Sequence, residues 1–387
     1  MAPRAQSELY STWRGLGRRL AFADGQPAAS AIVPTVACSL LLALSLPVVW
    51  GQTQAAGVSD ETAQAAPPNE TRTSLSIGEE GSLATGLRAP MPRWGNLLIV
   101  QPSFAWRRAD RWRASVSLAG ITSTYGQTHS QLRVKEAWAG ITLGDLDVTL
   151  GKRILKWGTG YAFTPSGVLD PPRRPTDPTD RLNLNEGREL AMAEYVHGRH
   201  ALTAAWATGG LLDTHRPDLR ETAAVRYNTL VGGFDAALIY AHERGRPGFY
   251  GANFTRVVGE AVEVHGELAH RGSTAVLLGG KYTLRCGVGT LFEWYAPAPG
   301  APRYIFFHAG KSRLRELPGW KHWDLGFSLL ANTTDRSRMV IFDAARRVAN
   351  HLTFTGRAEL PGGKRWQSEY GMIPYSALLS IGFRYQL

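Results

Sequence analysis

The sequence predicts an all-β protein, a closed, antiparallel, up-and-down transmembrane β-barrel of about 18 strands, with 16 strands as the second choice. Three observations lead to this fold class. Apolar and polar residues alternate with period two from about residue 71 to the end of the chain. The composition combines 42 Gly and 10% aromatic residues with a mean hydropathy of only −0.19. One apolar run alone, residues 31–50, approaches bilayer length, which excludes a bundle of membrane-spanning helices.

The alternation places apolar residues on one face of each strand and charged or small residues on the other. It is clear in the stretches 112–119, 262–268, 323–329 and 352–359. A soluble β-sandwich or propeller also alternates and is the alternative fold. A membrane barrel is favoured because many apolar faces end in an aromatic residue, as an interfacial girdle requires. The residues expected in this girdle are Trp112, Trp138, Trp206, Tyr227, Tyr240, Trp294 and Trp323.

The first 51 residues have the pattern of a signal peptide. Four arginines precede an apolar segment at 31–49, and small residues follow it. A single membrane anchor is the alternative interpretation. Residues 52–70 are rich in Gln, Ala, Thr and Pro and predict a flexible periplasmic leader, so the barrel is expected at 71–387. Removing residues 1–51 takes away four Arg, one Glu and one Asp, so the exported chain carries +11 − 2 = +9.

The predicted strands follow one another to the C-terminus without a domain break. They are expected at 72–86, 95–107, 111–125, 131–143, 146–158, 188–197, 200–211, 220–231, 234–243, 249–258, 261–271, 274–286, 288–296, 303–310, 321–331, 337–347, 350–360 and 375–387.

The lengths of the connections test this strand assignment. Bacterial barrels alternate short periplasmic turns with longer outer loops. Counting back from the C-terminus, the periplasmic set is 108–110, 144–145, 198–199, 232–233, 259–260, 287 and 348–349, all short, and the longer 311–320. The outer set contains 126–130, 159–187, 212–219, 244–248, 296–302 and 361–374, which hold most of the Pro. This alternation supports an even number of strands near 18.

The last strand alternates to the final residue. It resembles the closing strand of Gram-negative outer-membrane proteins, the strand that the barrel-insertion machinery recognises. The resemblance implies localisation in the outer membrane of a Gram-negative bacterium, with a terminal Leu where Phe is usual. The implied insertion signal consists of Phe383, Tyr385 and Leu387.

The loop expected at 159–187 is the most distinctive segment. Lys152-Arg153, Lys156-Trp157-Gly158 and Asp170-Pro171-Pro172 precede two Pro-Thr-Asp triplets. This region resembles a Lys/Arg, Trp-Gly, Pro, Asp-Pro segment of porin-like outer-membrane families of unassigned function. The resemblance implies that the loop folds into the lumen and narrows the pore. The expected constriction residues are Arg153, Lys156, Trp157, Tyr161, Asp170, Arg173, Arg174, Asp177, Asp180, Arg181, Glu186 and Arg188.

Opposed charges in such a loop would create a transverse field that filters solutes. The alternative is an outer loop held by its own salt bridges. Strand parity also predicts charged residues that face the lumen, although any one of them could instead belong to a structural ion-pair ladder. These residues are Arg113, Arg133, Lys135, Asp147, Arg226, Glu263, His265, Glu267, Asp324, Arg357, Glu359 and Arg384.

Catalytic and cofactor motifs are missing from the sequence. It contains no Gly-x-Ser-x-Gly and no His-Glu-x-x-His, and its histidines lack zinc spacing. We therefore expect no enzyme, no metal and no cofactor. Nucleic acid is not an expected partner because the basic residues are scattered through alternating strands.

The expected function is an outer-membrane channel for passive or facilitated diffusion of small hydrophilic solutes, anionic ones among them. One alternative is a barrel for export or surface assembly of an anionic polysaccharide. A second alternative is a barrel enzyme or adhesin that uses its outer loops. The expected partners are outer-membrane lipid and lipopolysaccharide, the barrel-insertion machinery and small solutes, with the chain as a monomer or homotrimer.

Overall fold

The computed structural model describes residues 69–109, 111–210, 219–312, 320 and 322–387. The predicted signal peptide at 1–51 lies outside the described residues, and so does all of the predicted leader except its last two positions. Those two positions already belong to the first strand, which begins at Asn69.

Eighteen strands and one short 3₁₀ turn make up the described chain. They are β1 (Asn69–Thr85), β2 (Trp94–Arg108), β3 (Trp112–Tyr125), β4 (Gln127–Leu143), β5 (Leu146–Arg153), β6 (Arg188–His197), β7 (His200–Ala207), β8 (Thr222–Val231), β9 (Phe234–Glu243), β10 (Phe249–Val258), β11 (Val262–His270), β12 (Thr274–Thr283), β13 (Gly289–Ala296), β14 (Tyr304–Lys311), β15 (Trp323–Asn332), β16 (Ser337–Ala349), β17 (Leu352–Gly362), η1 (Tyr370–Met372) and β18 (Ala377–Gln386).

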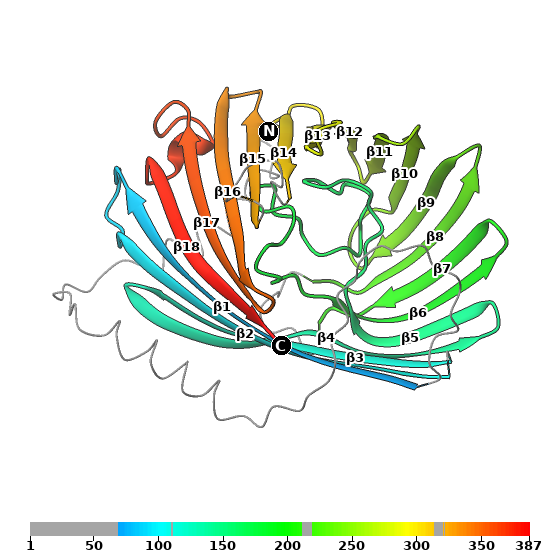
Figure 1. The fold of residues 1–387 in the computed structure, drawn as a ribbon. Helices are drawn as coiled ribbons and strands as arrows, with labels where there is room; N and C mark the ends of the chain where they lie inside the picture. Colours follow the sequence, from blue (N-terminus) through cyan, green and yellow to red (C-terminus); the bar gives the residue numbers. More distant parts are fainter. Residues whose placement is uncertain (1–68, 110, 211–218, 313–319, 321) are drawn as a thin grey trace. The chain divides into compact units, whose positions relative to one another are not determined.

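Every strand pairs antiparallel with its neighbours in sequence, and β1 pairs with both β2 and β18. The sheet is therefore closed, as Figure 1 shows, and no strand edge is left unpaired. The closing register joins Ser76 to Gln386 at one end and Thr85 to Ala377 at the other. This confirms the predicted closed barrel and its count of 18 strands. None of the described residues forms a helix long and apolar enough to cross a bilayer.

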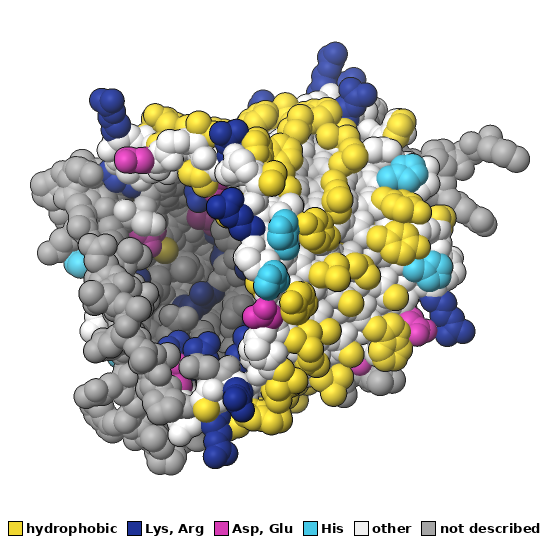
Figure 2. Space-filling model, turned by 90° about the vertical axis from the view of Figure 1, so that its right-hand side faces the viewer, with side chains coloured by type: hydrophobic (Ala, Val, Ile, Leu, Met, Phe, Trp, Pro, Cys, Tyr) yellow, Lys and Arg dark blue, Asp and Glu magenta, His cyan; other side chains and the backbone are white. Residues whose placement is uncertain are grey.

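The outward face of the sheet is apolar. Leu150, Leu238 and Ile381 lie near strand centres with exposed fractions of 67%, 63% and 75%. Figure 2 shows this face as a broad band of hydrophobic side chains, beside a hollow lined with charged ones. On β18 the neighbours of Ile381 on either side, Ser380 and Gly382, are buried on the inner face. The alternation seen in the sequence therefore separates an apolar exterior from a polar interior.

Most residues predicted for the aromatic girdle face outward, although Tyr227 lies near the middle of β8, where it pairs with Leu238, and not at a strand end. Trp112, Trp206, Tyr227 and Tyr240 are exposed on the outer face, with exposed fractions of 39% or more. Trp294 and Trp323 belong to the same face, because their neighbours Glu293 and Asp324 point inward with the buried residues of β13 and β15.

Trp138 is an exception, and its assignment to the girdle was wrong. The β3–β4 register pairs Ser117 with Glu136 and Leu118 with Val134, so Lys135 is an extra residue in a β-bulge. The bulge turns two successive charged side chains inward and reverses the parity beyond them. Trp138 consequently faces the interior, where the Arg153 guanidinium lies 4.7 Å from its ring centroid.

Several predicted strand ends also need correction. β5 ends at Arg153, not at 158, after Gly151 adopts a φ of +123°. A Cβ at Gly151 would lie 2.2 Å from the carbonyl oxygen of Ala137, so a glycine is required where the chain turns off the wall. The predicted outer loop 126–130 is a tight turn at Gly126, whose φ is +78°. The strands predicted at 200–211 and 274–286 are shorter and end at 207 and 283.

Candidate functional site

The segment 154–187 connects β5 to β6 and lies inside the barrel, where Figure 1 shows it surrounded by strands. Its polar contacts reach strands on all sides of the wall. In chain order these contacts are made to Glu136 on β4, Asn253 on β10, Glu267 on β11, Glu293 on β13, Arg357 on β17, Glu80 on β1, Gln101 on β2 and Arg133 on β4 again. The loop thus visits the wall in the order in which the strands follow one another, and returns to its starting point.

Glu267 on β11 holds the first bend of the loop. One carboxylate oxygen accepts hydrogen bonds from the backbone N–H groups of Thr159 and Gly160, both at 2.6 Å. The other oxygen accepts the N–H of Ser166 at 2.8 Å. Glu267 is only 4% exposed. Because these loop amides are buried away from water, the carboxylate supplies the acceptors that they need.

Glu293 on β13 holds the next two residues in the same way. Its two oxygens accept the N–H of Tyr161 at 2.5 Å and that of Ala162 at 2.9 Å. The Nε2 atom of His265, a fully buried residue of β11, lies 3.0 Å from the Glu293 carboxylate. The Tyr161 hydroxyl donates to Glu263 at 3.0 Å. Glu267 of β11 and Glu293 of β13 therefore hold successive backbone N–H groups of the loop, while Glu263 of β11 binds only the Tyr161 side chain.

The close approach of the loop to itself requires a glycine between these two anchors. A Cβ at Gly160 would lie 1.9 Å from the carbonyl oxygen of Phe163 and 3.2 Å from a methyl group of Leu277. The Asn253 side-chain amide donates to the carbonyl oxygen of Trp157 at 2.9 Å and to the hydroxyl of Ser166 at 2.8 Å. The bend is thus closed by hydrogen bonds from both ends.

Two apolar clusters add to this anchoring. Leu155, Trp157 and Leu169 of the loop pack in one cluster with inward residues of β6 to β11, among them Leu190 and Phe249. Ala162 and Phe163 pack in the second cluster with inward residues of β12 to β16, including Phe306, Leu330 and Met339. The barrel interior is therefore apolar where the loop docks, and burial of this surface stabilises the docked position.

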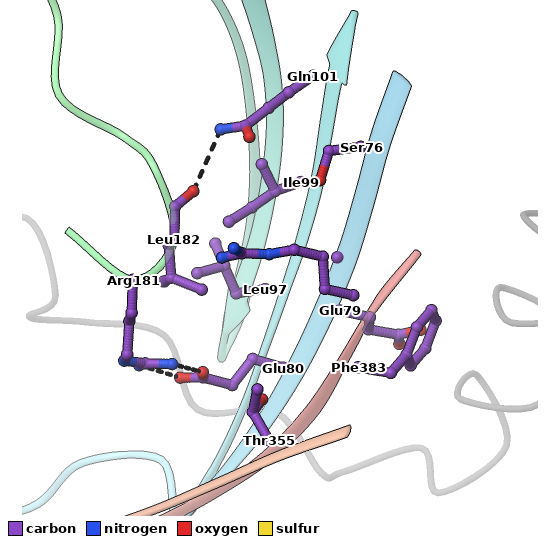
Figure 3. Close-up of a pocket in the computed structure, with 12 residues that line it drawn as sticks. Ser76, Glu79, Glu80, Leu97, Ile99, Gln101, Arg181, Leu182, Thr355 and Phe383 are labelled. Carbon is purple, nitrogen blue, oxygen red and sulfur yellow. Dashed lines mark hydrogen bonds and ion pairs between the residues drawn. The ribbon is translucent and has the colours of Figure 1, made fainter. Parts of the chain in front are cut away.

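The second half of the loop is fixed to the opposite part of the wall (Figure 3). The Arg181 guanidinium forms a two-pronged ion pair with Glu80 of β1, with Nη2 2.9 Å from Oε1. The Gln101 amide of β2 donates to the carbonyl oxygen of Leu182 at 3.2 Å, as Figure 3 shows. It also donates to the carbonyl oxygen of Asn183 at 2.8 Å. A cavity of about 50 Å³ remains between these side chains and Arg384 of β18.

The end of the loop is tied down by a buried charge cluster. Glu186 accepts from Arg133 of β4 and from Lys152 of β5, both at 3.1 Å. Lys152 is 1% exposed and Glu186 is 6% exposed. Removing Glu186 would take a buried acceptor from both cations at once, which costs free energy.

The other predicted constriction residues have different environments. Asp177 and Asp180 accept backbone N–H groups of the loop itself, from Arg181 and from 184–185. Arg173 donates to the carbonyl oxygen of Pro178 at 3.3 Å. Lys156 and Arg174 are exposed. Arg188, the first residue of β6 after the loop, donates to the carbonyl oxygen of Arg220 and to the hydroxyl of Thr222.

The residues predicted to face the lumen lie on the inner face of their strands. Several form ion pairs on the inner face: Arg113 of β3 contacts Asp147 of β5, and Arg357 of β17 contacts Glu359 on its own strand and Asp343 of β16. The remainder of this set consists of Arg133, Lys135, Arg226, Glu263, His265, Glu267, Asp324 and Arg384. Within the described ranges, no ion pair of 4.0 Å or less involves Lys135, Arg226 or Arg384.

Strands nine apart in a closed ring of 18 lie on opposite sides, so β4 faces β13. Inward charges on these two strands are already bound by the loop, because Arg133 of β4 pairs with Glu186 and Glu293 of β13 accepts loop N–H groups. The transverse field expected from the sequence stays a prediction.

Sequence reasoning did not select six residues that hold the loop: Glu80, Gln101, Glu136, Lys152, Asn253 and Glu293. Each is a polar residue in a strand, and Glu293 stands alone between Phe292 and Trp294. A lone acid in an apolar, aromatic strand is a signal that could have singled it out, but its partner lies 132 residues away. The described residues contain no group of three or more His, Cys, Asp or Glu that could hold a metal ion.

Asp170 is the one loop acid whose pKa is raised to about 6, and desolvation by burial is the main cause. The N–H groups of Trp157 and Gly158 donate to its oxygens at 2.6 and 3.0 Å and oppose this shift. Arg173 also lowers the pKa, whereas the negative charge of Glu267 raises it.

This raised pKa predicts a pH dependence of loop docking. With a pKa of 3.8 in the undocked chain and about 6 in the docked one, the docked loop binds more protons between these values. Docking is therefore favoured most below pH 4 and weakens as the pH rises through 6, by at most about 3 kcal/mol. Hydrogen exchange of residues 154–187 at pH 4 to 8 measures it. Asp170→Asn is expected to flatten the profile, and an unchanged slope in that variant would contradict the assignment to Asp170.

Comparison with known proteins agrees with the fold. The crystal structure of OccK11 (OpdR) from Pseudomonas aeruginosa superposes with a TM-score of 0.54 at 12% identity, covering 82% of this chain and 96% of that one. Wzi from Escherichia coli superposes with a TM-score of 0.54 at 8% identity, covering 81% of this chain and 83% of that one. Wzi is described as an outer-membrane, carbohydrate-binding β-barrel involved in Group 1 capsule assembly.

No protein-family model matches the sequence, and no curated protein does so either. At these identities the likeness is one of architecture. The chain has the fold of outer-membrane β-barrels.

Proposed function

We propose that the chain is a channel of a Gram-negative outer membrane, and that the segment 154–187 is its constriction. The observation that carries the proposal is the docking of this segment against inward side chains all around the wall. A loop bound in this way narrows the barrel without needing a separate domain. The apolar exterior suits lipid, and the hollow lined with charged side chains suits water (Figure 2).

Small anionic solutes are the proposed cargo. The acids Glu267, Glu293 and Asp170 are occupied by loop amides. Arg226 and Arg384 face the interior without a carboxylate within 4.0 Å in the described part of the chain, and both are partly exposed. Unpaired cations of this kind raise the local concentration of anions in a narrow passage.

Single-channel recording in planar bilayers tests this function. The wild-type chain is expected to give steady openings whose reversal potential in a KCl gradient indicates anion preference. Deletion of residues 164–183 removes the part of the loop between its first and last anchors and is expected to enlarge the conductance several-fold. A chain that conducts no current before or after the deletion contradicts the proposal.

A second candidate is a barrel for export or surface assembly of an anionic polysaccharide. Its support is the likeness in fold to Wzi, together with the extensive burial of the loop in two apolar clusters. A barrel that is closed in its wild-type form and conducts only after the same deletion favours this candidate over an open channel.

A further inference from the structure

Three arginines surround one carboxylate at the barrel rim that carries the long connections. Glu243 is the last residue of β9. Arg271, which follows β11, donates to one of its oxygens. Nη1 of Arg246 lies 3.5 Å from the other oxygen, and Nε of Arg220 lies 3.9 Å from it. We refer to Arg220, Arg246, Arg271 and Glu243 as the rim cluster.

The rim cluster has more positive charge and more donors than Glu243 can satisfy. Three guanidinium groups and one carboxylate sum to +3 − 1 = +2. Each guanidinium has five N–H donors, and a carboxylate has two oxygens. The neighbouring pair of Arg244 and Glu221, 3.7 Å apart, is neutral and adds no compensating charge. Counted over the described residues that contact one another here, the cluster is therefore two negative charges short of neutrality.

The geometry keeps the guanidinium groups together and open to a ligand. The Glu243 side chain is 11% exposed, whereas those of Arg220 and Arg246 are 47% and 36% exposed. Arg271 is also held by a cation–π interaction, because its guanidinium carbon lies 5.3 Å from the ring centroid of Phe249. A buried acid thus gathers three cations whose outer donors remain in contact with solvent.

The cluster faces the mouth of the barrel and not the lipid. Glu243 continues the inner face of β9, on which Ile239 and Ala241 are buried, while Leu238 and Tyr240 point outward. Phe249 belongs to the apolar cluster that receives the loop. A solute that enters the barrel from this rim would meet the three guanidinium groups before it reaches the loop.

We propose that the rim cluster binds a phosphate group, and so captures phosphorylated solutes at the entrance of the channel. A phosphate that carries two negative charges balances the +2 of the cluster, and its tetrahedral oxygens accept from several guanidinium groups at once. The capture role rests on the proposed channel function. The binding itself does not, and it can be measured without any current.

Titration calorimetry of the full chain in detergent, with inorganic pyrophosphate as the probe, tests the site. Arg220→Gln and Arg246→Gln are each expected to weaken binding about tenfold, the effect of losing one charge-assisted contact. Arg303→Gln removes the same charge from an exposed position elsewhere on this rim and serves as the matched control, with affinity within about twofold of wild type. Lack of binding to the wild type, or equal loss in the control, overturns the proposal.

A second arm distinguishes a free solute from a lipid headgroup. The chain is placed in nanodiscs with and without phosphatidic acid, and the titration is repeated. Unchanged pyrophosphate binding in both assigns the site to soluble phosphates. If pyrophosphate binds in nanodiscs without phosphatidic acid but not in those that contain it, the lipid headgroup occupies the site. That result keeps the phosphate site, assigns it to lipid and overturns solute capture. Because neither arm uses conductance, a chain that binds pyrophosphate and conducts nothing refutes the channel and leaves the site intact.

Discussion

Glu267→Gln is expected to release the first half of the inner loop. In the wild type both oxygens of this buried carboxylate accept backbone N–H groups, from Thr159 and Gly160 on one side and from Ser166 on the other. The glutamine has nearly the same shape, but its NH₂ group must face one of these donors. One side of the bend then loses its acceptor, and the remaining contacts lose the negative charge that strengthened them.

The expected size of this effect is large. Hydrogen bonds to a charged group contribute about 1.5–3 kcal/mol each, and a buried donor left without an acceptor costs about 1–3 kcal/mol. The loss of two or more such contacts reduces the docking free energy by at least about 3 kcal/mol. Hydrogen exchange of 157–166 should accelerate more than a hundredfold if docking limits exchange. In single-channel recordings the proposed channel is expected to show larger and noisier openings.

Glu263→Gln is the matched control for this experiment. Glu263 lies on the same strand and the same inner face, but it accepts a hydrogen bond from a side chain, the Tyr161 hydroxyl, and from no loop amide. The Glu263→Gln variant should therefore leave the hydrogen-exchange rates of residues 157–166 close to those of the wild type. If the two variants behave alike, the loop is held by its apolar contacts and the carboxylate is not the main anchor.

The barrel could be predicted from the sequence because its pattern is local. Each residue of a strand faces lipid or lumen according to its parity, so eight or ten residues suffice to define a strand. Even the weaker strands at 69–85 and 304–311 followed this pattern. The Gly residues at the short turns, such as Gly144 and Gly198 with φ near +60°, marked where one strand ends and the next begins.

The errors arose where this local pattern is interrupted. The bulge at Lys135 adds one residue to β4, and the only sign of it in the sequence is the pair of adjacent charges, Lys135 and Glu136. Parity counted through the bulge then placed Trp138 on the wrong face. β5 ends early for a similar reason, because Gly151 turns the chain inward while the residues after it remain apolar.

The partners of the loop could not be predicted from the sequence. Its residue types indicated a stiff, charged segment, and inward parity indicated Glu267 as a lumen residue. The contact between Gly160 and Glu267 spans 107 positions, and that between Tyr161 and Glu293 spans 132. Such pairings depend on the closure of the barrel, which brings distant strands around one segment. The strand pattern specifies the wall, but it does not specify what the wall binds.

Leu238→Arg is expected to cost the barrel about 2–4 kcal/mol in a lipid bilayer, the penalty for an arginine on the lipid-facing side near the bilayer midplane. Leu238 lies near the centre of β9, is 63% exposed and pairs with Tyr227 and Ala252 on the outer face. The substitution leaves the backbone pairing and the lumen unchanged. It therefore measures whether this surface meets hydrocarbon, on which every functional conclusion about the interior depends.

Urea-dependent folding into phosphatidylcholine vesicles provides the measurement, and Asn228→Arg provides the control. Asn228 lies on the adjacent strand β8, faces inward opposite the buried Ala237, and donates to Asp235. An arginine there adds the same charge on the inner face, where Asp235 and water can solvate it, so the folding free energy should change by less than about 1 kcal/mol. Equal destabilisation by the two variants would mean that the outer face is not in lipid, because a charge is costly only on the side from which water is excluded.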